Sequence, residues 1–396
     1  MVLSFILSII VALLINPSPI AAWLPSSGKI RGVNLGSQFV VEPWMASNEW
    51  SSMGCDSSSQ SEFDCVSQLG QSQANAAWAK HWASWIIHAD ITEMKSYGLN
   101  TIRVPVGYWI REDIVYSDSE HFPQGGLKYL EQICGWASDA GLYVIIDLHG
   151  APGAQVANNA DTGQYNPNPG FYAAYNYERA FKFLEWMTHI IHTNAKYKSV
   201  GMLEIVNEPE MGNTDHTNSM RDNYYPGAFE RIRAAEANLN VSTAKTLHVQ
   251  MMNTKWNSGN PNQYLSKNDS SRAYDDHRYL KYDNTIGSSP DAYLQASCSD
   301  DRGGDSPTIV GEWSLSLATI LQDNDVFAAN QANAAWYTKW FEAQVQAYEK
   351  QLGWIFWSWR TDLDDWRWDY KAAVAAGVIP KNLDDVADSN PCAGGS

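Results

Sequence analysis

The stretch Met202-Leu-Glu-Ile-Val-Asn-Glu-Pro209 is a short apolar run that ends in an amide, a carboxylate and a proline. Its apolar part, up to Val206, is typical of a strand buried on both faces of a parallel sheet. Pro209 cannot donate a ladder hydrogen bond, so we expect the strand to end before it. Asn207 and Glu208 would then stand at the carboxyl tip of the strand, where α/β barrels keep their reacting groups.

A second run of this kind, Pro307-Thr-Ile-Val-Gly-Glu-Trp-Ser314, places Glu312 at the end of another short apolar strand. Similar runs alternate with helical patterns along the chain, which predicts the α/β class and a single (β/α)₈ TIM barrel with rim-loop insertions. The expected strands are 30–36, 99–106, 142–149, 202–206, 246–252, 273–279, 307–313 and 353–359. The expected helices lie near 88–96, 131–140, 178–194, 228–237 and 330–350, and the insertions at 46–75, 153–170 and 210–222.

The amino-terminal residues 2–15 form an uninterrupted apolar run that is too short for a comfortable membrane span. A helix-breaking Asn-Pro-Ser-Pro segment and two alanines follow it. We therefore predict a secretory signal peptide at 1–22, a catalytic domain at 23–396 and a secreted, extracellular protein with no membrane association after cleavage. Sequons that begin at Asn240 and Asn268 predict glycosylation of surface segments.

Five cysteines suit a secreted protein with one or two disulfides. Cys55 and Cys65 lie close together in a Gly/Ser-rich segment and form the best candidate pair. Cys298 with Cys392 is a second, less strongly indicated pair. Cys134 falls on the apolar face of an expected helix, so we predict a buried free thiol there.

The chain of 396 residues has a formal net charge of −17 and a pI near 4.8. Nucleic-acid binding needs a basic surface, so this balance argues against nucleic acid, and equally against anionic membranes. The 18 tryptophans and 20 tyrosines exceed what packing alone usually requires. Sugar rings stack their C–H faces on aromatic planes, so the composition favours a neutral carbohydrate polymer as substrate.

Two carboxyl groups on one barrel mouth are the residue types that break glycosidic bonds. Retention of configuration needs them about 5–5.5 Å apart. We expect Glu208 to be the general acid/base, with a proton affinity raised by burial beside aromatic groups. Glu312 would be the nucleophile, ionised and held by a cation. No Cys/His spacing resembles a metal site, so we expect neither a metal nor another cofactor.

Other polar residues lie inside or at the ends of the apolar runs. Arg103 stands within Ile102-Arg-Val-Pro105 and needs an anionic partner, for which Glu312 is the natural candidate and a structural ion pair elsewhere the alternative. His149 ends its strand and could bond the reacting sugar or Glu312, although such a histidine is often a satisfied core group. Asn207 can hold the sugar 2-hydroxyl.

Two further segments supply candidates for the reacting subsite. His277 and Tyr279 alternate along one strand, so both side chains should point the same way. Tyr279 could donate to an oxygen of the nucleophile. Trp357, on the last expected strand, is a candidate platform beneath the reacting sugar.

These residues together carry a resemblance to glycoside hydrolase family 5, and the match covers nearly the whole chain after the signal segment. The matching elements are Asn207-Glu208-Pro209, Gly311-Glu312-Trp313, Arg103, His149, His277 with Tyr279, and Trp357. The resemblance implies a barrel fold, Glu208 as acid/base, Glu312 as nucleophile, and the other residues around the reacting sugar.

Within that family, 31–44 resembles a branch of fungal β-glucanases. In exo-acting β-1,3-glucanases of the branch, the glutamate that matches Glu42 binds hydroxyls of the non-reducing sugar. The segments 63–67, 117–125, 275–280 and 353–359 are more similar to secreted fungal members that cleave β-1,6-glucan internally.

We therefore expect a monomeric, retaining, endo-acting β-1,6-glucanase whose partner is a neutral β-glucan. The first alternative keeps the mechanism but removes sugars from the ends of β-1,3-glucan. The second is a catalytically silent carbohydrate-binding barrel, because a fold alone does not establish activity.

Overall fold

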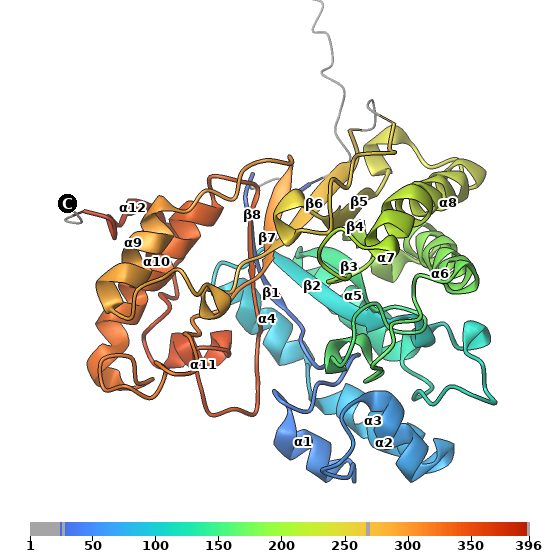
Figure 1. The fold of residues 1–396 in the computed structure, drawn as a ribbon, viewed down its shortest axis with the longest axis horizontal. Helices are drawn as coiled ribbons and strands as arrows, with labels where there is room; N and C mark the ends of the chain where they lie inside the picture. Colours follow the sequence, from blue (N-terminus) through green and yellow to red (C-terminus); the bar gives the residue numbers. More distant parts are fainter. Residues whose placement is uncertain (1–23, 26–27, 267–269, 394–396) are drawn as a thin grey trace, which may run out of the picture.

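The computed structural model describes residues 24–25, 28–266 and 270–393. Eight parallel strands pair in chain order and β1 closes on β8, so the predicted (β/α)₈ barrel is confirmed (Figure 1). The strands are β1 (Ile30–Asn34), β2 (Thr101–Gly107), β3 (Tyr143–Gly150), β4 (Val200–Glu204), β5 (His248–Met252), β6 (Arg272–His277), β7 (Thr308–Glu312) and β8 (Gly353–Phe356).

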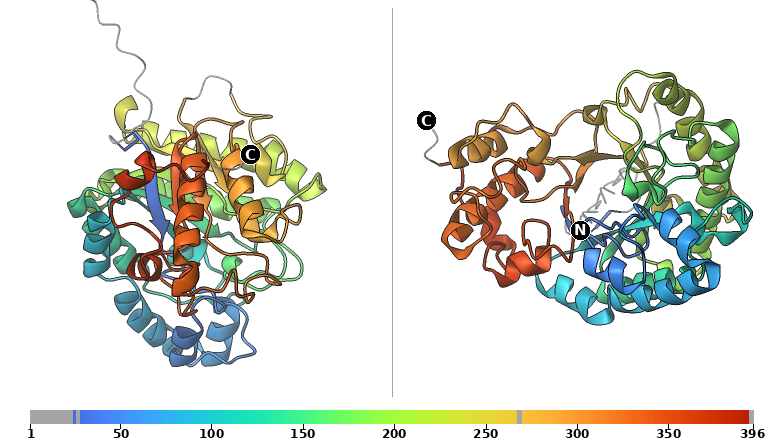
Figure 2. Two further views of the ribbon diagram at one scale, coloured as in Figure 1. Left: turned by 90° about the vertical axis from the view of Figure 1, so that its left-hand side faces the viewer. Right: turned by 60° about the horizontal axis from the view of Figure 1, so that its bottom comes forward.

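Helices surround the barrel, as the two further views show (Figure 2). Those that connect successive strands are α4 (His88–Ser96), α5 (Leu127–Ala140), α6 (Ala174–Thr193), α8 (Tyr225–Asn238), α9 (Pro290–Ser299) and α10 (Ala334–Tyr348). The sequence predicted all of these except α9. That helix is short, but Ser289 accepts the backbone N–H of Ala292 at its start and Pro290 occupies its first turn.

The insertion at 46–75 contains helices that the sequence analysis did not predict. It folds into α1 (Ser47–Ser52), α2 (Glu62–Leu69) and the start of α3 (Gln71–Ser84). Its Ser- and Gly-rich composition suggested a loop, but tertiary packing outweighs low helix propensity here, because Trp78 of α3 is fully buried. Shorter helices complete the chain: α7 (Asp215–Ser219), α11 (Tyr370–Ala375) and α12 (Asp384–Asp388).

The disulfides Cys55–Cys65 and Cys298–Cys392 are both present, and Cys134 is a buried free thiol, as predicted. Asn240 is exposed. The predicted signal peptide and the sequon at Asn268 lie outside the described residues. Across the described ranges, every helix is too short or too polar to cross a membrane.

The barrel interior is layered, and the layers position the site. One end holds an apolar cluster of Ile30, Tyr143, Ile145, Met202, Ala273, Ile309 and Ile355. Further along the same strands, the inward positions change to charged and amide side chains, which include Arg103, Asp147, Glu204 and Asp275, all fully buried. The polar groups therefore gather toward the carboxyl ends of the strands, where barrel enzymes react.

Candidate active site

A cavity of about 1210 Å³ opens at the carboxyl ends of the strands. Its walls contain eight of the nine predicted site residues: Glu42, His149, Asn207, Glu208, His277, Tyr279, Glu312 and Trp357. The ninth, Arg103, lies buried beneath the cavity and contacts Glu312.

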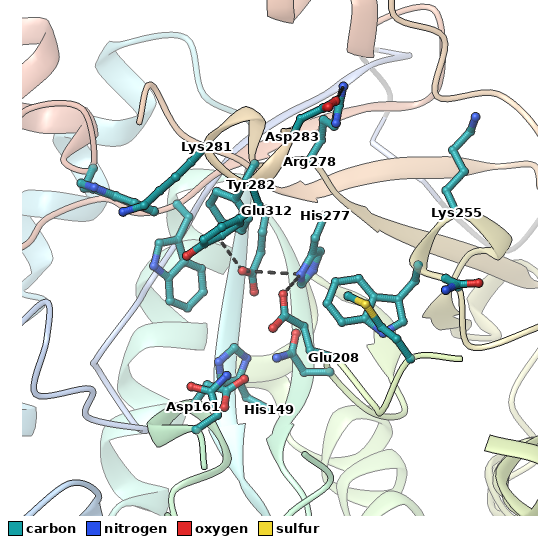
Figure 3. Close-up of a pocket in the computed structure, with 18 of the residues that line it drawn as sticks. His149, Asp161, Glu208, Lys255, His277, Arg278, Lys281, Tyr282, Asp283 and Glu312 are labelled. Atoms are coloured by element: carbon teal, nitrogen blue, oxygen red, sulfur yellow. Dashed lines mark hydrogen bonds and ion pairs between the residues drawn. The ribbon is translucent and has the colours of Figure 1, made fainter. Parts of the chain in front are cut away.

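Glu208 and Glu312 face each other in this cavity (Figure 3). One carboxylate oxygen of Glu208, one of Glu312 and one ring nitrogen of His277 all lie within 4.8 Å of one another. Glu312 is the last residue of β7. β4, in contrast, ends at Glu204, two residues before the expected end at Val206, although the N–H groups of Ile205 and Asn207 still bond carbonyls of Gln250 and Leu148 on the neighbouring strands.

The two carboxyl groups differ in exposure. The Glu208 side chain is 21% exposed, so the expected burial of this residue is only partial, whereas that of Glu312 is 6% exposed. Glu208 also adopts a positive φ of 35°, a backbone conformation that non-glycine residues rarely adopt. Backbone outliers of this kind concentrate at functional sites.

His277 lies between the two glutamates. Its Nδ1 donates to Glu208 Oε1 at 2.6 Å and lies 3.5 Å from Glu312 Oε2, while its Nε2 faces Asp275 Oδ2 at 3.3 Å. Burial lowers the pKa of His277, but Glu312, Asp275 and the hydrogen bond to Glu208 raise it more, so the net pKa is well above the ordinary value. The ring is therefore an imidazolium with a donor on each nitrogen.

Two hydrogen-bond donors and a histidine surround the Glu312 carboxylate. Arg103 Nη1 donates to Oε1 at 2.9 Å, and the hydroxyl of Tyr279 donates to Oε2 at 2.8 Å. Nδ1 of His277 lies at an ion-pair distance of 3.5 Å from Oε2. Burial is the largest influence on the pKa of Glu312 and raises it, although the charges of His277 and Arg103 act in the opposite direction.

Arg103 is shared among more acids than the sequence analysis anticipated. Besides Glu312 it contacts Asp147 at 3.1 Å, Glu204 at 2.9 Å and Asp275 at 3.6 Å. These acids point inward from strands, and in the sequence they stand within runs of mostly apolar residues. The signal that could have revealed them is a charged residue at an inward position of a buried strand, where it needs a partner.

One wall of the cavity carries polar atoms that face inward without partners. His149 donates from Nδ1 to Asp147 at 2.7 Å and stacks on Trp357 with centroids 5.5 Å apart. Its Nε2 and one oxygen of Glu42 have no hydrogen-bond partner among the described residues. Burial lowers the pKa of His149, but Asp147 raises it to about 9, whereas burial raises the pKa of Glu42 to about 7.

Asp161 is a site residue that the sequence analysis missed. It is 5% exposed, lines the cavity, and neither carboxylate oxygen has a partner within the part of the chain that the structure describes. Burial, and next the charge of Glu208, raise its pKa well above the ordinary value. Nothing in its sequence context marks it, because a lone aspartate in a Gly/Asn/Pro-rich loop is usually solvated.

Aromatic rings form much of the remaining wall. Trp44 and Trp368 pack edge to face, Tyr279 lies against Trp368, and the cavity also exposes Trp256 and Tyr282. Trp256 donates to the carbonyl of Pro209, which fixes its ring beside Glu208. The aromatic excess of the composition is thus partly accounted for by this cavity.

The Glu208–His277–Glu312 group has the composition of a metal site, but its chemistry differs. The raised pKa of His277 favours the imidazolium, in which Nδ1 donates to Glu208 and offers no lone pair to a cation. A cation between two carboxyl groups suits a general acid and a nucleophile instead.

A pair of facing carboxyl groups at the mouth of a (β/α)₈ barrel is the arrangement of the retaining glycoside hydrolases. The comparisons with known proteins agree. The model described as Cellulase (glycosyl hydrolase family 5) matches residues 57–362, and the chain belongs to this family.

Relatives of known name share most of the chain. It is 60% identical over 370 residues to glucan endo-1,6-beta-glucosidase B of Emericella nidulans, covering 93% of this chain and 90% of the relative. It is 29% identical over 402 residues to a probable glucan 1,3-beta-glucosidase A of Neosartorya fischeri, covering 93% and 91%. Rutinosidase from Aspergillus niger shares the fold, with a TM-score of 0.70 at 20% identity over 89% of this chain and 98% of that one.

Proposed function

We propose that this glycoside hydrolase is an endo-acting β-1,6-glucanase that works with retention of configuration on a neutral β-glucan. The observation that carries the mechanism is the approach of Glu208 and Glu312 to within 4.8 Å around His277. The linkage rests on the 60% identity to an enzyme named for endo-1,6 cleavage.

Glu312 attacks the anomeric carbon while Glu208 gives its proton to the departing glycosidic oxygen. The C1–O bond breaks, an ester to Glu312 forms, and Glu208 becomes a carboxylate. Glu208 then removes a proton from water, which attacks C1 and releases Glu312. Arg103 and Tyr279 hold the attacking carboxylate in place through their hydrogen bonds to it.

The other cavity residues bind the sugar that reacts. The amide nitrogen of Asn207 has no hydrogen-bond partner in the described ranges and is free to bind the 2-hydroxyl. Its oxygen accepts from Arg103 at 2.8 Å, which fixes the orientation of the amide. Trp357 supplies an apolar face, and the free atoms of His149 and Glu42 can bond further hydroxyls.

Glu42 favours one alternative, an exo-acting β-1,3-glucanase, because its free oxygen could cap a non-reducing end. Product sizing separates the two functions. Oligosaccharides released from the β-1,6-glucan pustulan support endo-1,6 cleavage. Glucose alone, released from the β-1,3-glucan laminarin, would overturn the proposal in favour of the alternative, and carboxymethylcellulose serves as a β-1,4 control.

We also propose that the protein is secreted as a monomer after removal of 1–22. Its two disulfides suit an oxidising compartment. Amino-terminal sequencing of protein from culture medium, and its mass in solution, test both statements. A retained 1–22 segment or a dimer would contradict them.

A further inference from the structure

A compartment of fully buried charged groups lies directly beneath the reacting carboxyl groups. Arg103 of β2, Asp147 of β3, Glu204 of β4 and Asp275 of β6 are all 0% exposed. Glu204 pairs in register with Asp147 on one side and with Gln250 of β5 on the other, so the three side chains share one layer.

The compartment holds more acids than cations. Together with Glu312 above it, and with Glu208 taken as the protonated general acid of the proposed mechanism, the ionisable acids are Asp147, Glu204, Asp275 and Glu312, and the cations are Arg103, His149 and His277. If every group were ionised, one buried negative charge would have no counterpart, at a cost of several kcal/mol. A single proton on one of the four acids makes the compartment neutral.

The donors around each acid indicate which one carries the proton. Asp275 accepts the backbone N–H groups of Gly311 at 2.9 Å and Asp276 at 2.8 Å, and it also faces His277. Asp147 binds both His149 and Arg103 through Oδ2, while its Oδ1 has no partner in the described ranges. The charge of each of these acids is therefore stabilised by donors from at least two different residues.

Glu204 accepts hydrogen bonds from a single side chain. Both Nε and Nη2 of Arg103 lie 2.9 Å from its Oε2, whereas its Oε1 receives no hydrogen bond from the described residues. Both amide atoms of the neighbouring Gln250 also lack partners within the described chain. The acceptor for a Glu204 proton is Asp275, because a hydrogen bond between the two side chains lowers the pKa of Asp275. Besides Arg103, Asp147 and Asp275, the hydroxyl of Tyr225 on α8 interacts electrostatically with Glu204.

The electrostatics agree with this geometry. Burial, and then the negative charges of Asp275 and Asp147, raise the pKa of Glu204 well above its ordinary value, against the lowering effect of Arg103. The pKa of Asp275 is lowered: burial raises it, but the charge of His277, the hydrogen bond from His277 and Arg103 outweigh that effect.

We propose that Glu204 is a neutral carboxylic acid throughout the working pH range and acts as a positioning residue for Arg103. A neutral Glu204 accepts from Nε and Nη2 of Arg103 without competing as a charge, so Nη1 of Arg103 remains available to the nucleophile. The inference rests on the proposed role of Glu312 but does not depend on which glucan is cleaved.

The acid limb of the pH profile of kcat/KM tests the charge of Glu204. If Glu204 were ionised, removal of its negative charge would lower the pKa of Glu312 and move the acid limb to lower pH. We expect Glu204→Gln and Glu204→Met to leave the midpoint of the limb in place. A downward shift in either Glu204 variant overturns the proposal.

A second measurement does not need activity. The infrared difference spectrum of wild type minus Glu204→Gln should contain the carbonyl band of a protonated carboxylic acid from the acid limb to pH 8 or so. A carboxylate band in its place would overturn the proposal.

Glu204→Ala should lower kcat about 10-fold or more with little change in KM, whereas Glu204→Gln should keep most of the wild-type kcat. If the wild-type enzyme does not cleave pustulan, these measurements are made on the glucan that it does cleave. The proposal on substrate and the proposal on Glu204 can therefore be refuted independently.

Discussion

Nδ1 of His277 donates a hydrogen bond of 2.6 Å to Oε1 of Glu208. The same nitrogen lies 3.5 Å from Glu312, so one histidine contacts both carboxyl groups. In the proposed mechanism, negative charge moves from Glu312 to Glu208, and the imidazolium can stabilise it at either position.

His277→Gln should therefore move the acid limb of kcat/KM to higher pH. The charge of His277 lowers the pKa of Glu312, so its loss raises that pKa, and the ionised nucleophile then appears only at higher pH. A pH–rate series on the preferred glucan measures the shift. His216→Gln is the matched control, because His216 pairs with Glu210 and does not line the cavity. An unchanged or lower limb in His277→Gln would contradict the argument.

Glu208→Gln and Glu312→Gln should each fold normally and lose nearly all hydrolysis of polymer. Loss of the general acid costs about 10²- to 10⁴-fold, and loss of the nucleophile should cost at least as much. Glu210→Gln, two residues from Glu208, should retain wild-type rates. Wild-type activity in either of the first two variants would refute the role assigned to that glutamate.

Azide provides a stereochemical test of the nucleophile. In Glu312→Gly, azide that enters the vacated space attacks C1 directly, so the glycosyl azide should have inverted configuration. NMR assignment of the anomeric configuration of the glycosyl azide measures the outcome. A glycosyl azide of retained configuration would count against Glu312 as the nucleophile.

Tyr279→Phe should lower kcat/KM by about 10- to 100-fold, because it removes a hydrogen bond of about 1.5–3 kcal/mol to a charged carboxylate. It should also raise the pH of the acid limb, since the hydroxyl stabilises ionised Glu312. Tyr282→Phe is the matched control, as Tyr282 lines the cavity and is 68% exposed. Equal losses in the two variants would show that the hydroxyl of Tyr279 has no particular role.

Glu62 predicts a pH dependence of folding stability. It is fully buried, accepts hydrogen bonds from Val41 and Trp78, and burial raises its pKa to about 8. The folded protein thus binds a proton that the unfolded chain releases near its ordinary pKa. The contribution of Glu62 to the free energy of unfolding is therefore greatest at low pH. It is lost as pH rises toward 8, by at most about 1.4 kcal/mol per pH unit.

We expect the free energy of unfolding of Glu62→Gln, measured by urea denaturation, to decrease less between pH 5 and pH 8 than that of wild type. Glu230→Gln changes an exposed glutamate and should leave the wild-type slope unaltered. A steeper slope in Glu62→Gln than in wild type would reverse the sign of the argument.

The barrel was predictable from the sequence because buried parallel strands leave uninterrupted apolar runs that end in polar residues. That Glu208 and Glu312 share one cavity was predictable from the same pattern, since Glu208 lies two residues after one such run and Glu312 ends another. Asp161 and Trp256 were not predictable, because both lie in polar loops whose fold depends on distant contacts, such as the bond from Trp256 to Pro209. Helix α2 was hidden by its Ser-rich flanks and is fixed by packing and a disulfide rather than by propensity.

The concentration of indole rings around the cavity has a practical consequence. Trp44, Trp256, Trp357 and Trp368 all line it, and Trp357 stacks on a cationic histidine. A saccharide that enters must change the polarity around these chromophores, so occupancy can be followed optically without a label. In a hydrolytically dead Glu208→Gln protein, emission titrated with oligosaccharides of increasing length would count the sugar units that the enzyme holds at once.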